Sequence, residues 1–213
     1  MILAAAVCPQ PPGMVPELGS GVADDLAEVR AASIAAIGGM LGVGVDRVLV
    51  VGDGAAAISD DDAGGTLAGF GVDVRAGGPD LVLPPALTVG AWLLDQAGWD
   101  GRRTYTSGLV DDTGDIGVLV MADGSSRHRR LAPEWSDVEG RQFDAKVAQA
   151  LGSGDAEALG SLDLALADEV GASGITGLVS LGACAKGASV EARLRYEGAP
   201  FDVGYWVADW RFN

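Results

Sequence analysis

Apolar runs alternate with stretches of helical periodicity along most of the chain. Residues 2–8 form a continuous apolar run and residues 47–51 contain a second, which is typical of strands buried on both faces of a parallel sheet. Between them, apolar side chains recur near one face over residues 22–41, which predicts a helix after a proline-rich loop. The opening of the chain therefore predicts strand, loop, helix and strand in that order.

The same patterns predict further elements down the chain. Short apolar runs indicate strands, which in chain order are 71–75, 104–109, 116–121, 190–196 and 203–210. Apolar side chains at helical spacing indicate helices over 85–96, 137–151, 155–160, 162–170 and 174–186. The segment 59–62, a serine followed by three aspartates, indicates one more helix start. The last two strands are separated by a short turn, which predicts a C-terminal β-hairpin.

Alternation of strands with helices predicts an α/β fold with a mostly parallel central sheet between two layers of helices. No linker composition interrupts the chain, so residues 1–213 are expected to form a single domain. In such sheets ligands bind outside the carboxyl ends of the strands. The loops 9–12, 52–55 and 122–126 follow predicted strands in this way, and we expect them to form the walls of any site.

The charge balance disfavours two classes of partner. Lys and Arg number 14 against 30 Asp and Glu, which gives a formal net charge of −16. A surface this acidic repels phosphate backbones and anionic lipid heads, so we expect neither a nucleic-acid nor a membrane partner. No run of about 18 apolar residues predicts a transmembrane helix, and a cytoplasmic protein is expected.

The residues available for chemistry are few. His128 is the one histidine, so it is the only base available to a Ser-His-Asp or Cys-His arrangement. Cys8 ends a buried strand and is expected to pack as a small apolar side chain. Several acids lie near predicted strand ends, and two or three that converge can hold a hard cation such as Mg²⁺ or Mn²⁺: Glu17, Asp53, Asp112, Asp123 and Glu197. With 30 acids in the chain, chance proximity is also expected.

Four segments resemble a known superfamily, in register along essentially the whole chain. Residues 8–17, CPQPPGMVPE, resemble the opening of the class III extradiol ring-cleavage dioxygenase catalytic subunit, where Pro-His-Pro-Pro precedes an aliphatic residue and Pro-Glu. Residues 120–126, VMADGSS, resemble a family strand followed by Gly-Asp-Leu-Ser-His. Residues 140–144 fit the helix that follows, and residues 196–205 resemble the closing hairpin.

The resemblance implies a non-haem Fe(II) held by two histidines and a carboxylate, with a further histidine as acid/base. In this chain the first of these histidines is replaced by Gln10, and the second falls at Gly52 or Asp53. The acid/base histidine falls at Ser126, with His128 two residues further on. The third metal ligand has no assigned position. A glutamine amide is a poor replacement for imidazole on Fe(II), and serine does not shuttle protons near neutral pH.

The main hypothesis is therefore a catalytically degenerate member of this superfamily, without iron or another cofactor. We expect its crevice to bind a small polar ligand near Gln10, Asp53, Asp123 and Ser126. The same hypothesis allows an assembly role, with a homo-oligomer formed through aromatic residues near the C-terminus: Tyr205, Trp206, Trp210 and Phe212. The alternative for these aromatics is that some of them alternate into the core.

The alternative is an enzyme with a rebuilt site. It uses Mg²⁺ or Mn²⁺ held by Asp53 and Asp123, or Cys8 or Ser126 as nucleophile, in an oxidoreductase, hydrolase or transfer reaction. A further possibility is that the loop carrying His128 folds back and places the His128 imidazole at the lost acid/base position. These alternatives stay open at the level of the sequence.

Overall fold

The computed structural model describes residues 1–18, 25–54, 61–108, 114–128 and 134–213, with the side chains of 134–137 left aside. Its centre is a six-stranded sheet of order β6-β2-β7-β1-β9-β8. The strands are β1 (Ile2–Cys8), β2 (Arg47–Val51), β6 (Arg102–Thr106), β7 (Ile116–Met121), β8 (Val190–Gly198) and β9 (Tyr205–Phe212). The first four are parallel, whereas β9 runs antiparallel to β1 and forms a hairpin with β8. The predicted α/β class and the C-terminal hairpin are confirmed.

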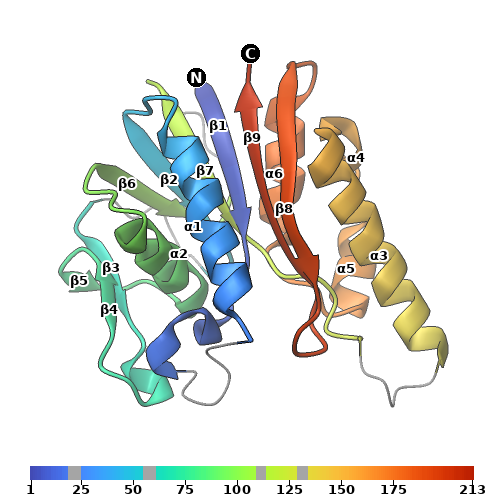
Figure 1. Ribbon diagram of the computed structural model, residues 1–213, viewed down its shortest axis with the longest axis horizontal. Coiled ribbons are helices and arrows are strands. Elements are labelled where there is room, and N and C mark those ends of the chain that lie inside the picture. Colours follow the sequence, from blue (N-terminus) through green and yellow to red (C-terminus); the bar gives the residue numbers. More distant parts are fainter. Residues whose placement is uncertain (19–24, 55–60, 109–113, 129–133) are drawn as a thin grey trace.

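Helices cover both faces of the sheet (Figure 1). One layer holds α1 (Ala27–Leu41) and α2 (Pro85–Gln96); the other holds α3 (Glu134–Ser153), α4 (Ala156–Gly160), α5 (Leu164–Glu169) and α6 (Ile175–Ala185). Alternate residues of the sheet serve the two cores, since Ala6 faces the first layer and Val7 the second. Among the described helices, none has the length and apolar character needed to cross a bilayer.

A second sheet of three short strands lies beside α2 and was missed by the sequence patterns. Its order is β4 (Arg75–Gly77), β3 (Ala63–Thr66) and β5 (Asp80–Leu81). The helix start expected at 59–62 is wrong in its described part, because Asp61 and Asp62 lead directly into β3. The strand expected at 71–75 begins only at Arg75. Gly65 explains the close packing on α2, because a Cβ there would lie 1.9 Å from Thr88 Oγ1.

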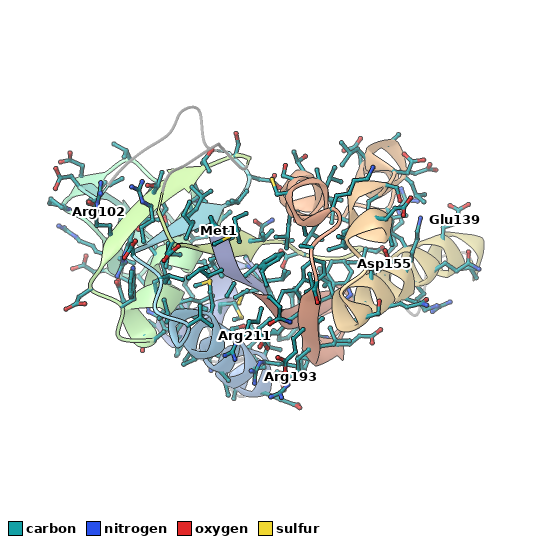
Figure 2. All side chains as sticks on the ribbon, turned by 90° about the horizontal axis from the view of Figure 1, so that it is seen from above. Met1, Arg102, Glu139, Asp155, Arg193 and Arg211 are labelled. Atoms are coloured by element: carbon teal, nitrogen blue, oxygen red, sulfur yellow. The ribbon has the colours of Figure 1, made fainter. Side chains whose placement is uncertain are left out.

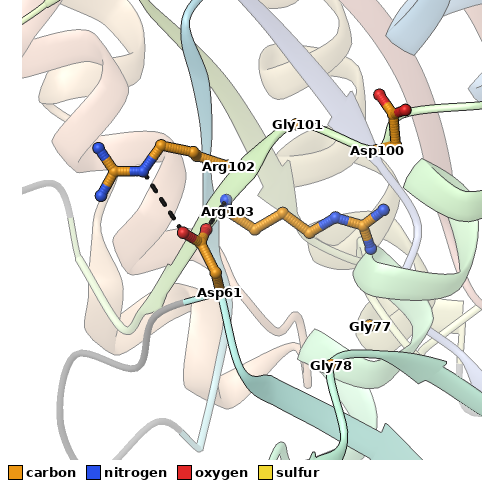
Figure 3. A pocket seen from close by; sticks show the side chains of 7 residues that line it. All are labelled: Asp61, Gly77, Gly78, Asp100, Gly101, Arg102 and Arg103. Atoms are coloured by element: carbon orange, nitrogen blue, oxygen red, sulfur yellow. Dashed lines mark hydrogen bonds and ion pairs between the residues drawn. The ribbon is translucent and has the colours of Figure 1, made fainter.

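One carboxylate ties the small sheet to the large one. Asp61 Oδ1 accepts the backbone N–H of Arg103 at 2.6 Å, and Arg102 Nε lies 3.4 Å from Oδ2 (Figure 3). The Arg103 guanidinium in turn pairs with Asp95 of α2 at 2.7 Å. A cavity of about 330 Å³ lies between these residues and Gly78. The Asp61 and Arg103 side chains on its wall are already paired within the chain.

The C-terminal aromatics belong to the core of the chain, which corrects their expected exposure. Tyr205 is 4%, Trp206 1% and Trp210 2% exposed. Trp210 Nε1 donates to Leu151 O of α3 at 2.8 Å, and the partly buried Phe212 packs edge-on against the Trp210 ring. Trp206, Trp210 and Phe212 therefore pack β9 into the core on the α3 side, whereas Tyr205 belongs to the core on the α1 side. The expected homo-oligomer thus loses the surface proposed for it.

We expect Trp210→Phe to lower the free energy of unfolding by about 2–4 kcal/mol, because it leaves the buried Leu151 carbonyl unpaired and removes buried volume. Urea denaturation followed by circular dichroism measures this loss. The matched control is Trp99→Phe, since Trp99 is only partly buried and its Nε1 lies at a long 3.4 Å from Arg102 O. The control is expected to cost less than about 1 kcal/mol, and equal losses in the two variants would contradict the anchoring role.

Candidate functional site

Three neighbouring parallel strands end at the same edge of the large sheet. In their register Cys8 lies opposite Met121, and Val51 lies opposite Val120. The loops after β1, β2 and β7 therefore leave the sheet side by side, as the topology of a parallel sheet requires. Beyond β1 the chain passes into two short 3-10 turns, Pro12–Met14 and Pro16–Leu18, where sequence analysis had expected irregular loop.

Gln10 lies in the first of these loops and is 8% exposed. Its backbone N–H donates to Asp123 Oδ1 at 3.0 Å, and its Nε2 donates to Ser173 Oγ at 2.8 Å. Its Oε1 is buried and has no hydrogen-bond partner among the described residues. The other such side-chain atom is the Tyr105 hydroxyl, which lies elsewhere, beneath the small sheet. Gln10 is thus fixed by two contacts, while its buried acceptor Oε1 is left without a partner.

The segment Ser173–Gly174, just before α6, joins the strand ends together. Gly174 N–H donates to Asp53 Oδ2 at 2.6 Å, while Ser173 and Asp123 exchange backbone hydrogen bonds of 2.9 and 3.0 Å. Gly174 has φ 72°, and a Cβ on it would lie 2.1 Å from Met121 O, so only glycine fits. This segment was not among the predicted site loops; the signal for it in the sequence is a Ser-Gly pair immediately before an apolar helix.

Three of the predicted ligand-binding residues are therefore brought to one place. Gln10, Asp53 and Asp123 all contact Ser173 or Gly174, although they lie on three different loops. Of the other acids considered, Glu17 and Glu197 have no described hydrogen bond to this cluster, and Asp112 lies outside the described residues. The cluster is a set of oxygen acceptors at the polar end of an apolar sheet.

Asp123 is the electrostatically perturbed group of this cluster. Burial raises the pKa of its carboxyl from 3.8 to about 7, the Gln10 N–H partly offsets this, and the charge of Asp53 raises it further. The Tyr205 phenol is buried nearby, and its pKa is raised by that burial and then by the Asp123 charge. Asp123 therefore changes protonation near neutral pH while Tyr205 remains a neutral hydroxyl.

Ser126 and His128, the candidate catalytic pair, are held by other contacts. Ser126 is exposed, its N–H donates to Val170 O at 3.1 Å, and its hydroxyl lies over Gly171. His128 Nε2 lies 2.5 Å from Asp144 Oδ2 of α3, which is 5% exposed. Asp144 also accepts the Ser125 N–H at 2.8 Å, and burial raises its pKa despite both partners.

The His128 imidazole is thus paired with Asp144 of α3. No described hydrogen bond joins the imidazole to Ser126 or to the Gln10–Asp53–Asp123 cluster. Asp144 was not among the residues singled out by sequence. Its location in the first half of a predicted helix gave no sign that its side chain points back toward a loop. Ser126 is the one predicted ligand-binding residue without a described contact to the cluster.

Cys8 packs as expected from its place at the end of β1. Its side chain is fully buried, and its thiol lies 4.0 Å from Ser33 O of α1. Burial raises the pKa of the thiol to about 12, so the thiolate needed for nucleophilic attack is scarce near neutral pH.

The donor set does not fit the Fe(II) site that the resemblance implies. Imidazole is missing at the positions of Gln10, Asp53 and Ser126, and the single histidine is engaged by Asp144. Within the described part of the chain, no three His, Cys, Asp or Glu side chains lie close enough to hold a metal ion together. Asp53 and Asp123 each already accept a backbone N–H with one oxygen.

Comparison with known proteins gives no family assignment. No protein-family model matches the chain. No curated protein matches it either. The extradiol dioxygenase resemblance therefore rests on the four sequence segments alone.

We expect the stability contribution of Asp123 to depend on pH. The folded-state pKa lies above the unfolded value, so between about pH 4 and 7 the folded chain binds more protons, and stability falls as pH rises through this window. The full penalty, reached above about pH 7, is on the order of 4 kcal/mol. Asp123→Asn removes this penalty. In urea denaturation, the free energy of unfolding of the variant relative to the wild type should therefore increase between pH 5 and pH 8.

The matched control is Asp73→Asn, an exposed carboxylate 3.7 Å from Arg75. Its effect should stay within about 0.5 kcal/mol at both pH values. A difference between Asp123→Asn and wild type that is the same at pH 5 and pH 8 would show that the Asp123 carboxyl has an ordinary pKa.

Proposed function

We propose that this chain is a catalytically degenerate homologue of the class III extradiol ring-cleavage dioxygenases that binds a small polar ligand at the ends of β1, β2 and β7. The observation that carries the proposal is the buried, unpartnered Oε1 of Gln10. A buried acceptor without a partner costs about 1–3 kcal/mol, and a bound donor recovers it. The accompanying expectation is a cytoplasmic protein whose partner is a small molecule.

The chemistry of the crevice selects a ligand that donates hydrogen bonds. Gln10 Oε1 is an acceptor, and the Asp53 and Asp123 carboxylates accept through oxygens as well. In the observed orientation Gln10 Nε2 donates to Ser173 Oγ, so Oε1 is the amide atom left for the ligand. A compound with adjacent hydroxyls, such as a catechol, presents matching donors. An anionic ligand is disfavoured by the two carboxylates.

Ring cleavage is not part of the proposal, for a chemical reason. The family reaction needs imidazole ligands on Fe(II) and an imidazole base, whereas this crevice offers an amide and carboxylates. His128 is committed to Asp144 on another side of the loop. Binding without oxidation is what the remaining side chains can support.

A second candidate function is supported by one observation, the electrostatic effect of Asp53 on Asp123. Two carboxyls that repel each other are stabilised by a cation between them, and the oxygen donors suit Mg²⁺ or Mn²⁺. This alternative makes the chain a metal-dependent oxidoreductase or hydrolase with a rebuilt carboxylate site.

We expect catechol to bind the purified protein in isothermal titration calorimetry. Gln10→Leu keeps the side-chain volume but removes the buried acceptor, and it should weaken binding roughly tenfold. Gln149→Leu, at an exposed position of α3, is the matched control and should bind like the wild type. Oxygen consumption with added Fe(II) should stay at the background level.

Elemental analysis of protein purified without chelator completes this test, and iron should be well below one atom per chain. Stoichiometric iron together with catechol cleavage would overturn the degenerate assignment. Unchanged affinity in Gln10→Leu would overturn the binding site, even if iron is absent.

The carboxylate alternative makes a separate prediction. Mg²⁺ or Mn²⁺ should raise the melting temperature of the wild type, and the increase should disappear in Asp53→Asn and in Asp123→Asn while both variants stay folded. Asp73→Asn should keep the increase. A wild type that shows no shift with either cation contradicts the alternative and leaves the ligand-binding proposal in place.

A further inference from the structure

The hairpin β8–β9 presents one charged face beside α1. Its two strands alternate, so Trp210 points into the core under α3, while its neighbours Asp209 and Arg211 point to the opposite side. On β8 the residues on that side are Glu191, Arg193 and Arg195. Helix α1 packs on β1 and β9 and reaches β8 only at its margin, so none of the described helices lies over this part of the sheet (Figure 1).

A cavity of about 300 Å³ lies between this face and the last turns of α1. Arginines from both strands of the hairpin line it, Arg193 and Arg195 from β8 and Arg211 from β9. Figure 2 shows Arg193 and Arg211 on the same side of the molecule. The wall from α1 is Gly39, where a Cβ would already lie 3.4 Å from Arg195 Nη2 and from Asp209 Oδ2. The absence of a side chain at Gly39 therefore keeps the cavity open.

The charges in this cavity are not balanced by the chain itself. Arg195 forms an ion pair with Asp209. Arg193 lies directly across from the same Asp209, and Arg211 lies across from Glu191. Neither Arg193 nor Arg211 has a hydrogen-bond or ion-pair partner among the described residues. Two guanidinium groups are thus available to a ligand in a chain whose net charge is −16.

We propose that this cavity binds the phosphate group of a small hydroxylated compound. Guanidinium groups present paired N–H donors that match phosphate oxygens, and two of them can hold one phosphate from two sides. Glu191 lines the same cavity and is an acceptor, which suits a hydroxyl carried next to the phosphate. The volume is at the lower limit of small-molecule sites, so a short phosphate ester fits better than a nucleotide.

This site is independent of the proposed function. Arg211 pairs with Ala4 near the start of β1, whereas Gln10 lies beyond the end of the same strand. The two sites therefore lie toward opposite ends of the β1 strand. They also differ in chemistry, since the Gln10 site offers hydrogen-bond acceptors and the arginine site offers donors. Failure of either one leaves the other unaffected.

Isothermal titration calorimetry with inorganic phosphate and with glycerol 3-phosphate, at constant ionic strength, tests the proposal. Both should bind, the ester more tightly, because its hydroxyls reach Glu191. Arg193→Ala and Arg211→Ala should each weaken binding at least about tenfold, and the double variant should abolish it. Arg75→Ala, on the exposed β4, is the charge-matched control and should leave both affinities unchanged.

A pair of glycine variants tests the position of the ligand without changing charge. Gly39→Leu fills the cavity and should abolish binding, whereas a Cβ at the adjacent Gly38 meets no atom within 4 Å, so Gly38→Leu should bind normally. Binding of inorganic phosphate alone supports recognition of the phosphate group but removes the role given to Glu191. Failure of both probes to bind, or equal weakening of binding by Arg75→Ala, overturns the site.

Discussion

The hydrogen bonds between Ser173–Gly174 and the ends of the parallel strands hold the candidate site in place. Parallel strands buried between two helix layers present apolar side chains along their length, and their polar atoms gather where each strand ends. At these strand ends the Ser173 backbone is hydrogen-bonded to the Asp123 backbone, and the Gly174 N–H donates to the Asp53 carboxylate. Ser173 Oγ accepts a hydrogen bond from the Gln10 amide. Because Gly174 alone fits against Met121 O, the geometry of three loops depends on one backbone conformation.

Two buried carboxyls near this edge show how partners decide the role of an acid. Asp144 and Asp123 both have raised pKa values because of burial. Asp144 has an imidazole and a backbone N–H as partners, so its charge fastens α3 to the loop after β7. Asp123 has one backbone N–H and a neighbouring carboxylate. Its ionised form is therefore poorly compensated, which makes Asp123 the carboxyl that gains most from a ligand.

The strands with a continuous apolar run were predictable from the sequence, and the short strands of the small sheet, which lack such a run, were not. The runs at residues 2–8, 47–51 and 116–121 became strands at those positions, because four to seven consecutive apolar side chains suit a strand buried on both faces. The small sheet was missed because β3 reads Ala-Gly-Gly-Thr, and glycine has low strand propensity. Likewise β6 begins at Arg102, two residues before the predicted start at residue 104, because the two arginines interrupt the apolar pattern of the strand.

For the site, sequence predicted which loops meet but not what joins them. The convergence of Gln10, Asp53 and Asp123 follows from strand order, which a parallel α/β pattern already restricts. Ser173 lies just before α6, and Asp144 lies on α3. Only tertiary packing brings these two side chains to the loops at the strand ends. The exposure of Trp206, Trp210 and Phe212 was wrongly predicted for a related reason, since alternation alone does not show that α3 covers their face of the sheet.

The antiparallel hairpin gives the fold a second polar surface with the opposite chemistry. A parallel strand needs a crossover helix, and the helices of such units bury both faces of the sheet. The β8–β9 pair is added through a turn, so no helix is needed on its α1 side, and charged side chains can occupy alternate positions there. With three arginines against two carboxylates, that face carries local positive charge on an acidic chain. The net negative charge of the protein repels anions at long range, so an anion gains most where guanidinium groups contact it directly.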